Sequence, residues 1–302
     1  MKLCKLLPQS RSANSQLSRL FSSRVINEIA KYGHSTTGSR LFCGLGIESH
    51  NAANISLAEF YNELFTHLFR HYRYEYIYKN ALAEKILIGK YGTRNATMLS
   101  EFRVENCIAD IVLLNGTSHA FEIKSEMDSL DRIERQINAY SSVFDKITIV
   151  THLNNFARIE KIIPDHVGIS VLDDSRYRIK KKPHRDAVSN LNSVSSLAIL
   201  NVLHRTEYIK IIKHHFHEDI SAIPNTLSYS TAAGYFSQIP PRVAHEHMVL
   251  ALKKRKTASV ISDALRSLPT SLKAAALKLS RSKKDIPRLI EALSRDIKTV
   301  FL

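Results

Sequence analysis

The chain of 302 residues contains no tryptophan, three cysteines, nine glycines and eight prolines. This composition excludes a collagen-like chain, and 44% hydrophobic residues exclude a wholly disordered one. The cysteines Cys4, Cys43 and Cys107 lie far apart without a CxxC pair, which argues against a disulfide framework or a cysteine zinc site. No apolar run approaches the roughly 18 residues of a membrane-spanning helix. We therefore expect a globular, cytoplasmic protein with no membrane partner.

Acidic residues are missing from the first 27 positions, which carry several arginines and lysines. A basic, serine-rich and acid-free start is typical of an organelle transit peptide. However, apolar residues recur at helical spacing from Leu17 to Ile26 and continue into Ile29 and Ala30. We therefore prefer an amphipathic helix that packs on the rest of the protein.

The net charge of +15 is unevenly distributed. Residues 1–174 hold 20 basic and 19 acidic residues, whereas residues 175–302 hold 23 basic and 9 acidic ones. An excess confined to one half favours a polyanionic partner there, and we expect nucleic acid. A basic surface that only confers solubility is the alternative.

The middle of the chain alternates between helical and strand-like patterns. Residues 36–56 are expected to form a loop and residues 57–90 a helical region. Strands are expected at 96–104, 109–115, 119–125, 146–152 and 168–173, with helices at 129–143, begun by Asp128, and at about 155–163. This order predicts an α/β fold whose mixed sheet is part antiparallel hairpin and part crossover-connected.

Four segments follow from this pattern. They are an N-terminal helical extension (1–56), an α/β core (57–174), a basic linker containing Pro183 (175–189), and a basic helical domain (190–302), interrupted at 223–234 and 239–241.

The charged residues of the expected hairpin are the candidates for a catalytic or metal-binding site. Glu122 and Lys124 lie two residues apart on a strand and therefore point to the same face. The Asn115-Gly116 turn folds the strand with Asp110 back beside them. A two-residue loop would pair Asp110 with Phe121, and a four-residue loop would pair it with Ile123.

Two carboxylates beside a lysine suit metal-assisted phosphodiester hydrolysis. Mg²⁺ takes oxygen ligands, lowers the pKa of a bound water and neutralises charge on a phosphate. Lys124 would orient the water or stabilise the developing charge. A solvated hairpin with cross-strand ion pairs is the alternative, but the apolar run Ile108–Leu114 argues against it.

The string of Asp110, Glu122-Ile123-Lys124 on a hairpin resembles the PD-(D/E)xK nuclease superfamily. The following Gln136 and Tyr140 resemble the QxxxY element of its RecB-like subset. The resemblance covers roughly residues 57–174, and Ala109 stands where the superfamily motif has proline. The segments LSRLFSSRVINEIA and FEIKSEMDSLDRIERQINAYSSVFDKITIVTH are also similar to a bacterial family of uncharacterised nuclease-like proteins often associated with mobile elements.

This resemblance implies a restriction-endonuclease-like fold and a site for Mg²⁺ or Mn²⁺. The implied metal ligands are Asp110, Glu122, the backbone carbonyl of Ile123, and an acid from the preceding helix, for which Glu75 is preferred over Glu84. Lys124 would be catalytic, and Gln136 and Tyr140 would place the substrate.

Two further charged segments are ambiguous. The histidines His214, His215 and His217, and likewise His245 and His247 around Glu246, lack a zinc motif and favour a solvated or phosphate-contacting surface over a metal site. The KKRK run at 253–256 leads into a helix–turn–helix-like pattern at 257–279 and a basic amphipathic helix at 280–293. This region would either grip DNA phosphates or pack as a helical appendage.

Our first hypothesis is therefore an Mg²⁺- or Mn²⁺-dependent nuclease that hydrolyses DNA, in mobile-element biology or phage defence. The alternative is a non-catalytic nuclease-fold protein that binds DNA as a regulator. A third is an interaction protein whose basic half contacts an acidic protein partner. The sequence leaves open the choice of DNA or RNA, endonuclease or exonuclease action, and the formation of a homo-oligomer.

Overall fold

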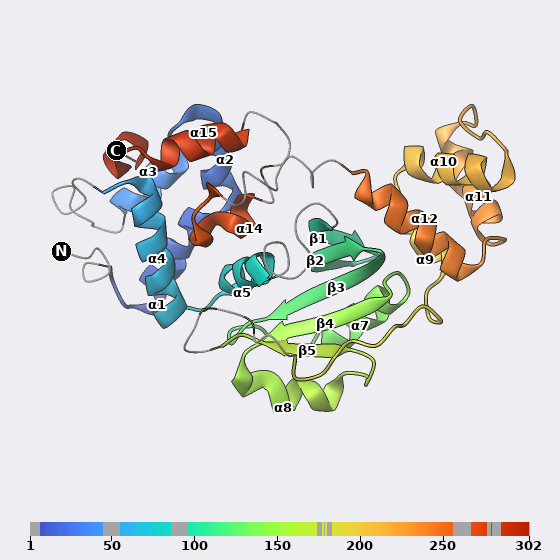
Figure 1. Ribbon diagram of the computed structural model, residues 1–302, viewed down its shortest axis with the longest axis horizontal. Coiled ribbons are helices and arrows are strands. Elements are labelled where there is room, and N and C mark those ends of the chain that lie inside the picture. Colours follow the sequence, from blue (N-terminus) through green and yellow to red (C-terminus); the bar gives the residue numbers. More distant parts are fainter. Residues whose placement is uncertain are drawn as a thin grey trace.

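The computed structural model describes residues 7–44, 55–85, 96–173, 177, 179, 183–255, 267–276, 279 and 285–301. It shows a mixed α/β fold in which helices pack on both faces of a five-stranded sheet (Figure 1).

The sheet keeps its strands in chain order. They are β1 (Thr97–Val104), β2 (Cys107–Asn115), β3 (Thr117–Lys124), β4 (Lys146–Thr151) and β5 (Gly168–Val171). The first three form an antiparallel meander, and β3, β4 and β5 run parallel. Helix α7 (Ile133–Ser141) makes the crossover from β3 to β4, and α8 (Leu153–Ile162) makes the one from β4 to β5. The predicted combination of a hairpin with crossover connections is confirmed.

The turn between β2 and β3 sets the register of the hairpin. Asn115 pairs with Thr117 across Gly116, whose φ of 75° is readily reached by glycine. Both loop lengths considered from the sequence are therefore wrong. Ile111 pairs with Phe121, so the next position places Asp110 opposite Glu122 rather than opposite Phe121 or Ile123.

The remaining elements of the described residues are helical. Preceding the sheet are α1 (Arg11–Ser18), η2 (Arg19–Phe21), α2 (Ser23–Tyr32), α3 (Thr36–Cys43), α4 (Leu57–His71) and α5 (Glu75–Ala83). Following it are α9 (Ser196–Val202), α10 (Arg205–Phe216), α11 (Asn225–Phe236), α12 (Pro241–Lys253), η4 (Thr270–Leu272), α14 (Lys273–Ala276), α15 (Asp285–Leu293) and α16 (Ile297–Phe301).

Each face of the sheet contributes to a different hydrophobic core. Ile111, Phe121 and Ile123 join the first core, which also contains side chains of α1–α5 and α14–α16. Val112 and Ala120, on the opposite face, join the second core with α7, α8 and α9–α12. The expected helical region 190–302 is thus divided between two cores.

The N-terminal segment packs as predicted for an amphipathic helix. Leu17, Leu20, Val25 and Ile26 are fully buried, although the segment forms two helices joined by η2 rather than one. The Tyr61 hydroxyl donates a hydrogen bond to the Leu20 carbonyl and ties η2 to α4. Helix α2 also packs against α15, so residues from both ends of the described chain lie side by side (Figure 1).

Three local expectations are wrong. Residues 36–43 form helix α3 rather than a loop, because the Ser35 hydroxyl accepts the Gly38 amide and caps it. Asp128 does not begin α7, because its carboxylate instead accepts the Ser125 amide and hydroxyl. Residues 225–236 form α11 rather than an interruption, since Pro224 precedes the first turn and leaves its hydrogen bonds intact.

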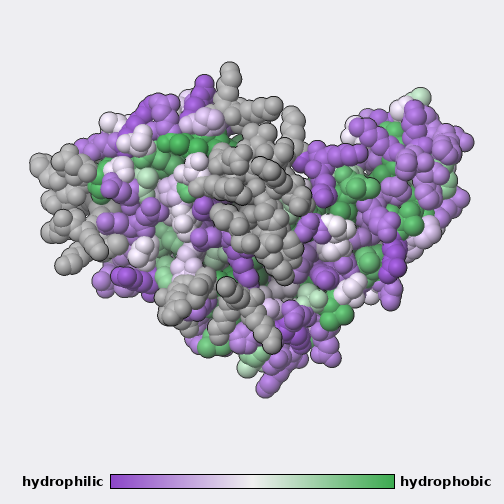
Figure 2. Space-filling model, viewed as in Figure 1, coloured by the Kyte–Doolittle hydropathy of each residue, from purple (hydrophilic) through white to green (hydrophobic). Residues whose placement is uncertain are grey.

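The surface seen in Figure 2 is mostly hydrophilic, with hydrophobic patches on the part formed by α9–α12. Exposed large apolar side chains there include Leu197, Leu227, Tyr229 and Leu250. Among the described residues, no helix is long and apolar enough to cross a membrane.

Candidate active site

Asp110 lies where the regular pairing of β2 with β1 is interrupted and where its pairing with β3 has ended at Ile111. The ladder with β1 omits Glu101 and Asp110, and Glu101 has a φ of 55°. The Asp110 Oδ2 atom accepts the Ile123 amide at 2.8 Å, and its Oδ1 atom lies 3.3 Å from Lys79 Nζ. One carboxylate oxygen of Asp110 is therefore hydrogen-bonded to β3, while the other faces the Lys79 ammonium.

Glu122 and Lys124 contact each other directly at the end of β3. Lys124 Nζ lies 3.0 Å from Glu122 Oε1, and both side chains are less than one tenth exposed. The Thr151 hydroxyl donates to the Lys124 carbonyl at 2.7 Å and fixes this strand end to β4. Glu122 and Lys124 thus lie on the same face of β3, as their two-residue spacing predicts, and form a direct ion pair.

Helix α7 completes the surroundings of Glu122. Gln136 donates its amide hydrogen to Glu122 Oε1 at 2.5 Å and accepts from Lys124 Nζ at 2.8 Å. The Tyr140 hydroxyl donates to Glu122 Oε2 at 2.9 Å. The spacing of four residues brings both side chains to one helix face, and there they orient Glu122.

The partly buried carboxylate of Asp110 and the buried carboxylate of Glu122 repel each other. Burial and the nearby charge of Glu122 raise the pKa of Asp110 to about 7, although Lys79 opposes this shift. Burial also raises the pKa of Glu122, against the charge of Lys124 and hydrogen bonds from Lys124, Tyr140 and Gln136. A bound proton or a bound cation would relieve the repulsion between these two carboxylates.

Lys79 on α5 is the important residue that sequence reasoning missed. Its ammonium pairs with Glu75, lies 3.3 Å from Asp110 and 3.9 Å from Glu101. Burial disfavours its charge, but the carboxylates of Asp110 and Glu75 outweigh this and raise the pKa of Lys79. The signal available in the sequence was a lysine four residues after Glu75, within the apolar run around Ile77 and Ala81.

Glu75 is the acid of the preceding helical region that approaches the site. It pairs with Lys79, and its charge contributes to the raised pKa of Asp110. Glu84 instead lies near Lys273, whose charge opposes the burial that raises the pKa of Glu84. The structure thus brings Glu75 to the predicted residues.

The chemistry of the oxygen donors fits a magnesium-type cation. Mg²⁺ is commonly held by one or two carboxylates together with water and substrate phosphate, and Asp110 and Glu122 supply two. Among the described residues, no group of three or more His, Cys, Asp or Glu side chains is arranged to hold a metal ion. The Ile123 amide is engaged by Asp110, and a ligand role for its carbonyl stays a prediction.

The histidine-rich segments meet elsewhere in the fold. The rings of His214 and His215 lie 5.5 Å and 6.0 Å from that of His247, where α10 meets α12. His217 adopts a left-handed conformation that ends α10. His245 is buried, and its Nε2 atom lies 2.7 Å from the Ser118 hydroxyl, which joins α12 to the sheet.

Arg255 of the basic run makes internal contacts. It pairs with Glu207 through two nitrogens, donates to the Val202 carbonyl at 2.9 Å and lies over the Phe102 ring. These internal contacts thus explain the position of Arg255, the arginine of the KKRK run. Lys256 and most of the helix–turn–helix-like pattern lie outside the described residues.

Comparison with known proteins places the chain in a family. The family model described as bacteriophage P4 protein cII matches residues 69–275, which is more than half of the chain and includes all the residues of this site. The chain belongs to this family. Protein cII of Enterobacteria phage P4 is 33% identical over 90 residues, covering 29% of this chain and 34% of that protein. The chain thus matches about a third of the length of this curated relative.

Among solved structures, a protein of unknown function from Silicibacter pomeroyi aligns with a TM-score of 0.31 at 12% identity. The alignment covers 49% of this chain and 94% of that protein.

Proposed function

We propose that this member of the P4 cII family is a metal-dependent nuclease acting on DNA. The observation that supports the proposal best is the joint arrangement of Asp110, Glu122 and Lys124, with Gln136 and Tyr140 holding Glu122. Two strands and one helix carry these side chains, and two carboxylates beside an amine suit metal-assisted hydrolysis of a phosphodiester.

Each residue has a role that follows from its contacts. Asp110 and Glu122 would provide oxygen ligands for Mg²⁺ or Mn²⁺, and Glu75 would extend the acidic edge toward α5. When bound, the metal would lower the pKa of a water and neutralise charge on the scissile phosphate. Lys124, held between Glu122 and Gln136, would place its positive charge beside the attacked phosphate. Gln136 and Tyr140 would act as positioning residues through Glu122.

A plasmid-nicking and oligonucleotide-cleavage assay tests the proposal. We expect cleavage with Mg²⁺ or Mn²⁺, its loss with EDTA, and at least a hundredfold lower rate in Asp110→Asn and Lys124→Met. Asp131→Asn and Lys161→Met are matched controls, because both original side chains are exposed. Equal cleavage by the site variants and the controls would contradict the proposal.

A second candidate is a DNA-binding protein that does not cleave. The pairing of Lys79 with Asp110 favours this reading, because an internal ammonium already neutralises part of the acidic cluster. It predicts salt-sensitive DNA binding by the basic half and no hydrolysis with any divalent ion. Either activity fits the proposed setting in a mobile element or phage defence, and the phage P4 relative supports that setting.

A further inference from the structure

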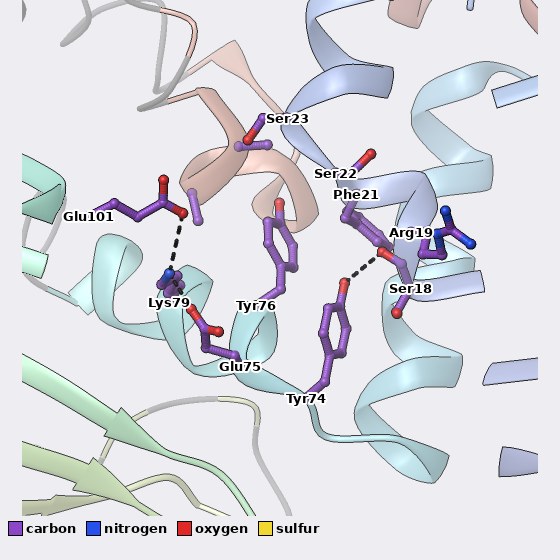
Figure 3. Close-up of a pocket in the computed structure, with 12 residues that line it drawn as sticks. Ser18, Arg19, Phe21, Ser22, Ser23, Tyr74, Glu75, Tyr76, Lys79 and Glu101 are labelled. Atoms are coloured by element: carbon purple, nitrogen blue, oxygen red, sulfur yellow. Dashed lines mark hydrogen bonds and ion pairs between the residues drawn. The ribbon is translucent and has the colours of Figure 1, made fainter. Parts of the chain in front are cut away.

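A pocket of about 300 Å³ lies beside the candidate site, at the junction of the N-terminal helices with α5 and β1 (Figure 3). In Figure 3, Glu75, Lys79 and Glu101 lie on one side of the pocket, Ser22 and Arg19 lie on the other, and Ser23 lies above Tyr76. Tyr74 and Tyr76 stand between these two sides in the same view. The pocket has the size of the smaller ligand sites in proteins, which start at about 300 Å³.

The pocket adjoins the acidic site through Lys79. This side chain lines the pocket and also lies 3.3 Å from Asp110 Oδ1. Glu75 lines the pocket and its charge reaches Asp110. A substrate held at Asp110 would therefore pass Lys79 to reach this space.

The walls of the pocket offer aromatic and polar groups together. The rings of Phe21 and Tyr76 lie 4.8 Å apart, and those of Tyr74 and Tyr76 lie 6.0 Å apart and stacked. The hydroxyls of Tyr74 and Tyr76 are held by the carbonyls of Ser18 and Ser271, which fixes both rings. Fixed aromatic rings are the surfaces on which single nucleobases stack.

The two ends of the pocket differ in charge. Glu75 and Glu101 would repel phosphate at one end unless a cation were bound there. Arg19 lines the other end and is exposed, and within the described part of the chain no carboxylate pairs with its guanidinium. An arginine with serine hydroxyls nearby is suited to a phosphate group.

We propose that this pocket receives one nucleotide of the strand to be cut, with its base against the tyrosines and its phosphate at Arg19. The neighbouring phosphodiester would then lie at Asp110 and Glu122. This inference rests on the proposed function, which supplies the DNA substrate. It adds residues of the N-terminal helices, Arg19 among them, to the substrate-binding residues of the hairpin motif.

Photocrosslinking locates the nucleotide directly. The full chain carrying Asp110→Asn, to prevent cleavage, is irradiated with a single-stranded oligonucleotide containing 5-bromodeoxyuridine in the presence of Ca²⁺, and crosslinked peptides are identified by mass spectrometry. We expect crosslinks at Tyr74 or Tyr76. Crosslinks confined to other parts of the chain would overturn the proposal.

Binding measurements provide an independent readout. With the same oligonucleotide, we expect Arg19→Ala to weaken binding about fivefold, as for one lost charge-assisted phosphate contact. Arg24→Ala is the control, because it removes an equal charge from neighbouring α2 at a side chain paired with Glu28 rather than facing the pocket. Equal effects of the two variants would overturn the proposal.

The outcomes separate this inference from the proposed function. Cleavage by the unmodified protein without pocket crosslinks would support the nuclease and overturn the nucleotide pocket. Pocket crosslinks together with an absence of cleavage would support the pocket as a binding site and overturn the nuclease.

Discussion

The Lys79 ammonium lies 3.3 Å from Asp110 Oδ1 and joins α5 to the interrupted pairing of β2. It also pairs with Glu75, so the same ammonium contacts a carboxylate of α5 and a carboxylate of β2. The arrangement gives the protein an internal counterion for a cluster of carboxylates that would otherwise destabilise the fold. Its consequences can be measured without knowing the substrate.

Asp110→Asn should stabilise the metal-free protein at pH 8. The raised pKa of Asp110, about 7, means that the folded state holds a proton there that an unfolded aspartate has already lost above about pH 4. Stability therefore falls as the pH rises from about 4 to 7, and the penalty is complete above 7. Asparagine avoids it and can still accept the Ile123 amide.

We expect a gain of about 2 kcal/mol in the free energy of unfolding at pH 8 and a smaller gain at pH 5, measured by urea denaturation in EDTA. Asp131→Asn should change neither value by more than about 0.5 kcal/mol, as is usual for a surface substitution. A destabilised Asp110→Asn at both pH values would show that Asp110 is stabilising in its ionised form.

Binding of Mg²⁺ or Mn²⁺ should strengthen as the pH rises through about 7. A metal ligand must be deprotonated, and the raised pKa of Asp110 keeps part of this carboxyl protonated below that pH. Isothermal titration at pH 6 and pH 8 should show at least a threefold lower dissociation constant at the higher pH. Glu122→Gln should remove this binding, and pH-independent affinity would argue against Asp110 as a ligand.

Lys79→Met should destabilise the metal-free protein more at pH 8 than at pH 5. Without the ammonium, the partly buried carboxylate of Asp110 loses the counterion that lies 3.3 Å from its Oδ1 atom, which costs about 3 kcal/mol when Asp110 is ionised. At pH 5 a proton replaces the lost cation. Thermal unfolding with and without Mg²⁺ tests this, because the metal should restore much of the loss at pH 8. An equal loss at both pH values would indicate a purely steric effect.

Arg255→Ala should lower stability by about 2 kcal/mol, because it removes the pair with Glu207 and the bond to Val202. Lys254→Ala, at the exposed neighbouring position, should have little effect on stability. Denaturant titration measures both. The same two variants should differ little in DNA affinity, and a selective loss in Arg255→Ala without destabilisation would instead indicate a phosphate contact.

The parts of the site that follow from local sequence were predictable. Glu122 and Lys124 share a strand face through their spacing, and Gln136 and Tyr140 share a helix face in the same way. Lys79 was not, because its pairing with Asp110 joins positions 31 residues apart on different elements. Asp128 shows a second limit, since an aspartate at this position can cap the following helix or accept the Ser125 amide before it, and the sequence does not decide between them.

Prediction of the fold had the same physical limit. The β-branched run at 146–151 specifies a buried strand by itself, whereas the start of α3 depends on Ser35 and also on Glu28, which binds Thr37 from the preceding helix. The pocket at Arg19 is still less predictable, because four separate segments of the chain form its walls.

The packing of α2 against α15 also has a consequence for synthesis on the ribosome. Val25 and Ile29 reach their fully buried state in a core that includes Leu289 and Leu293, which are translated more than 250 residues later. The nascent chain must carry these apolar side chains in another environment until then. The α5–β3 segment bearing the acidic residues thus emerges long before the core beneath it is complete.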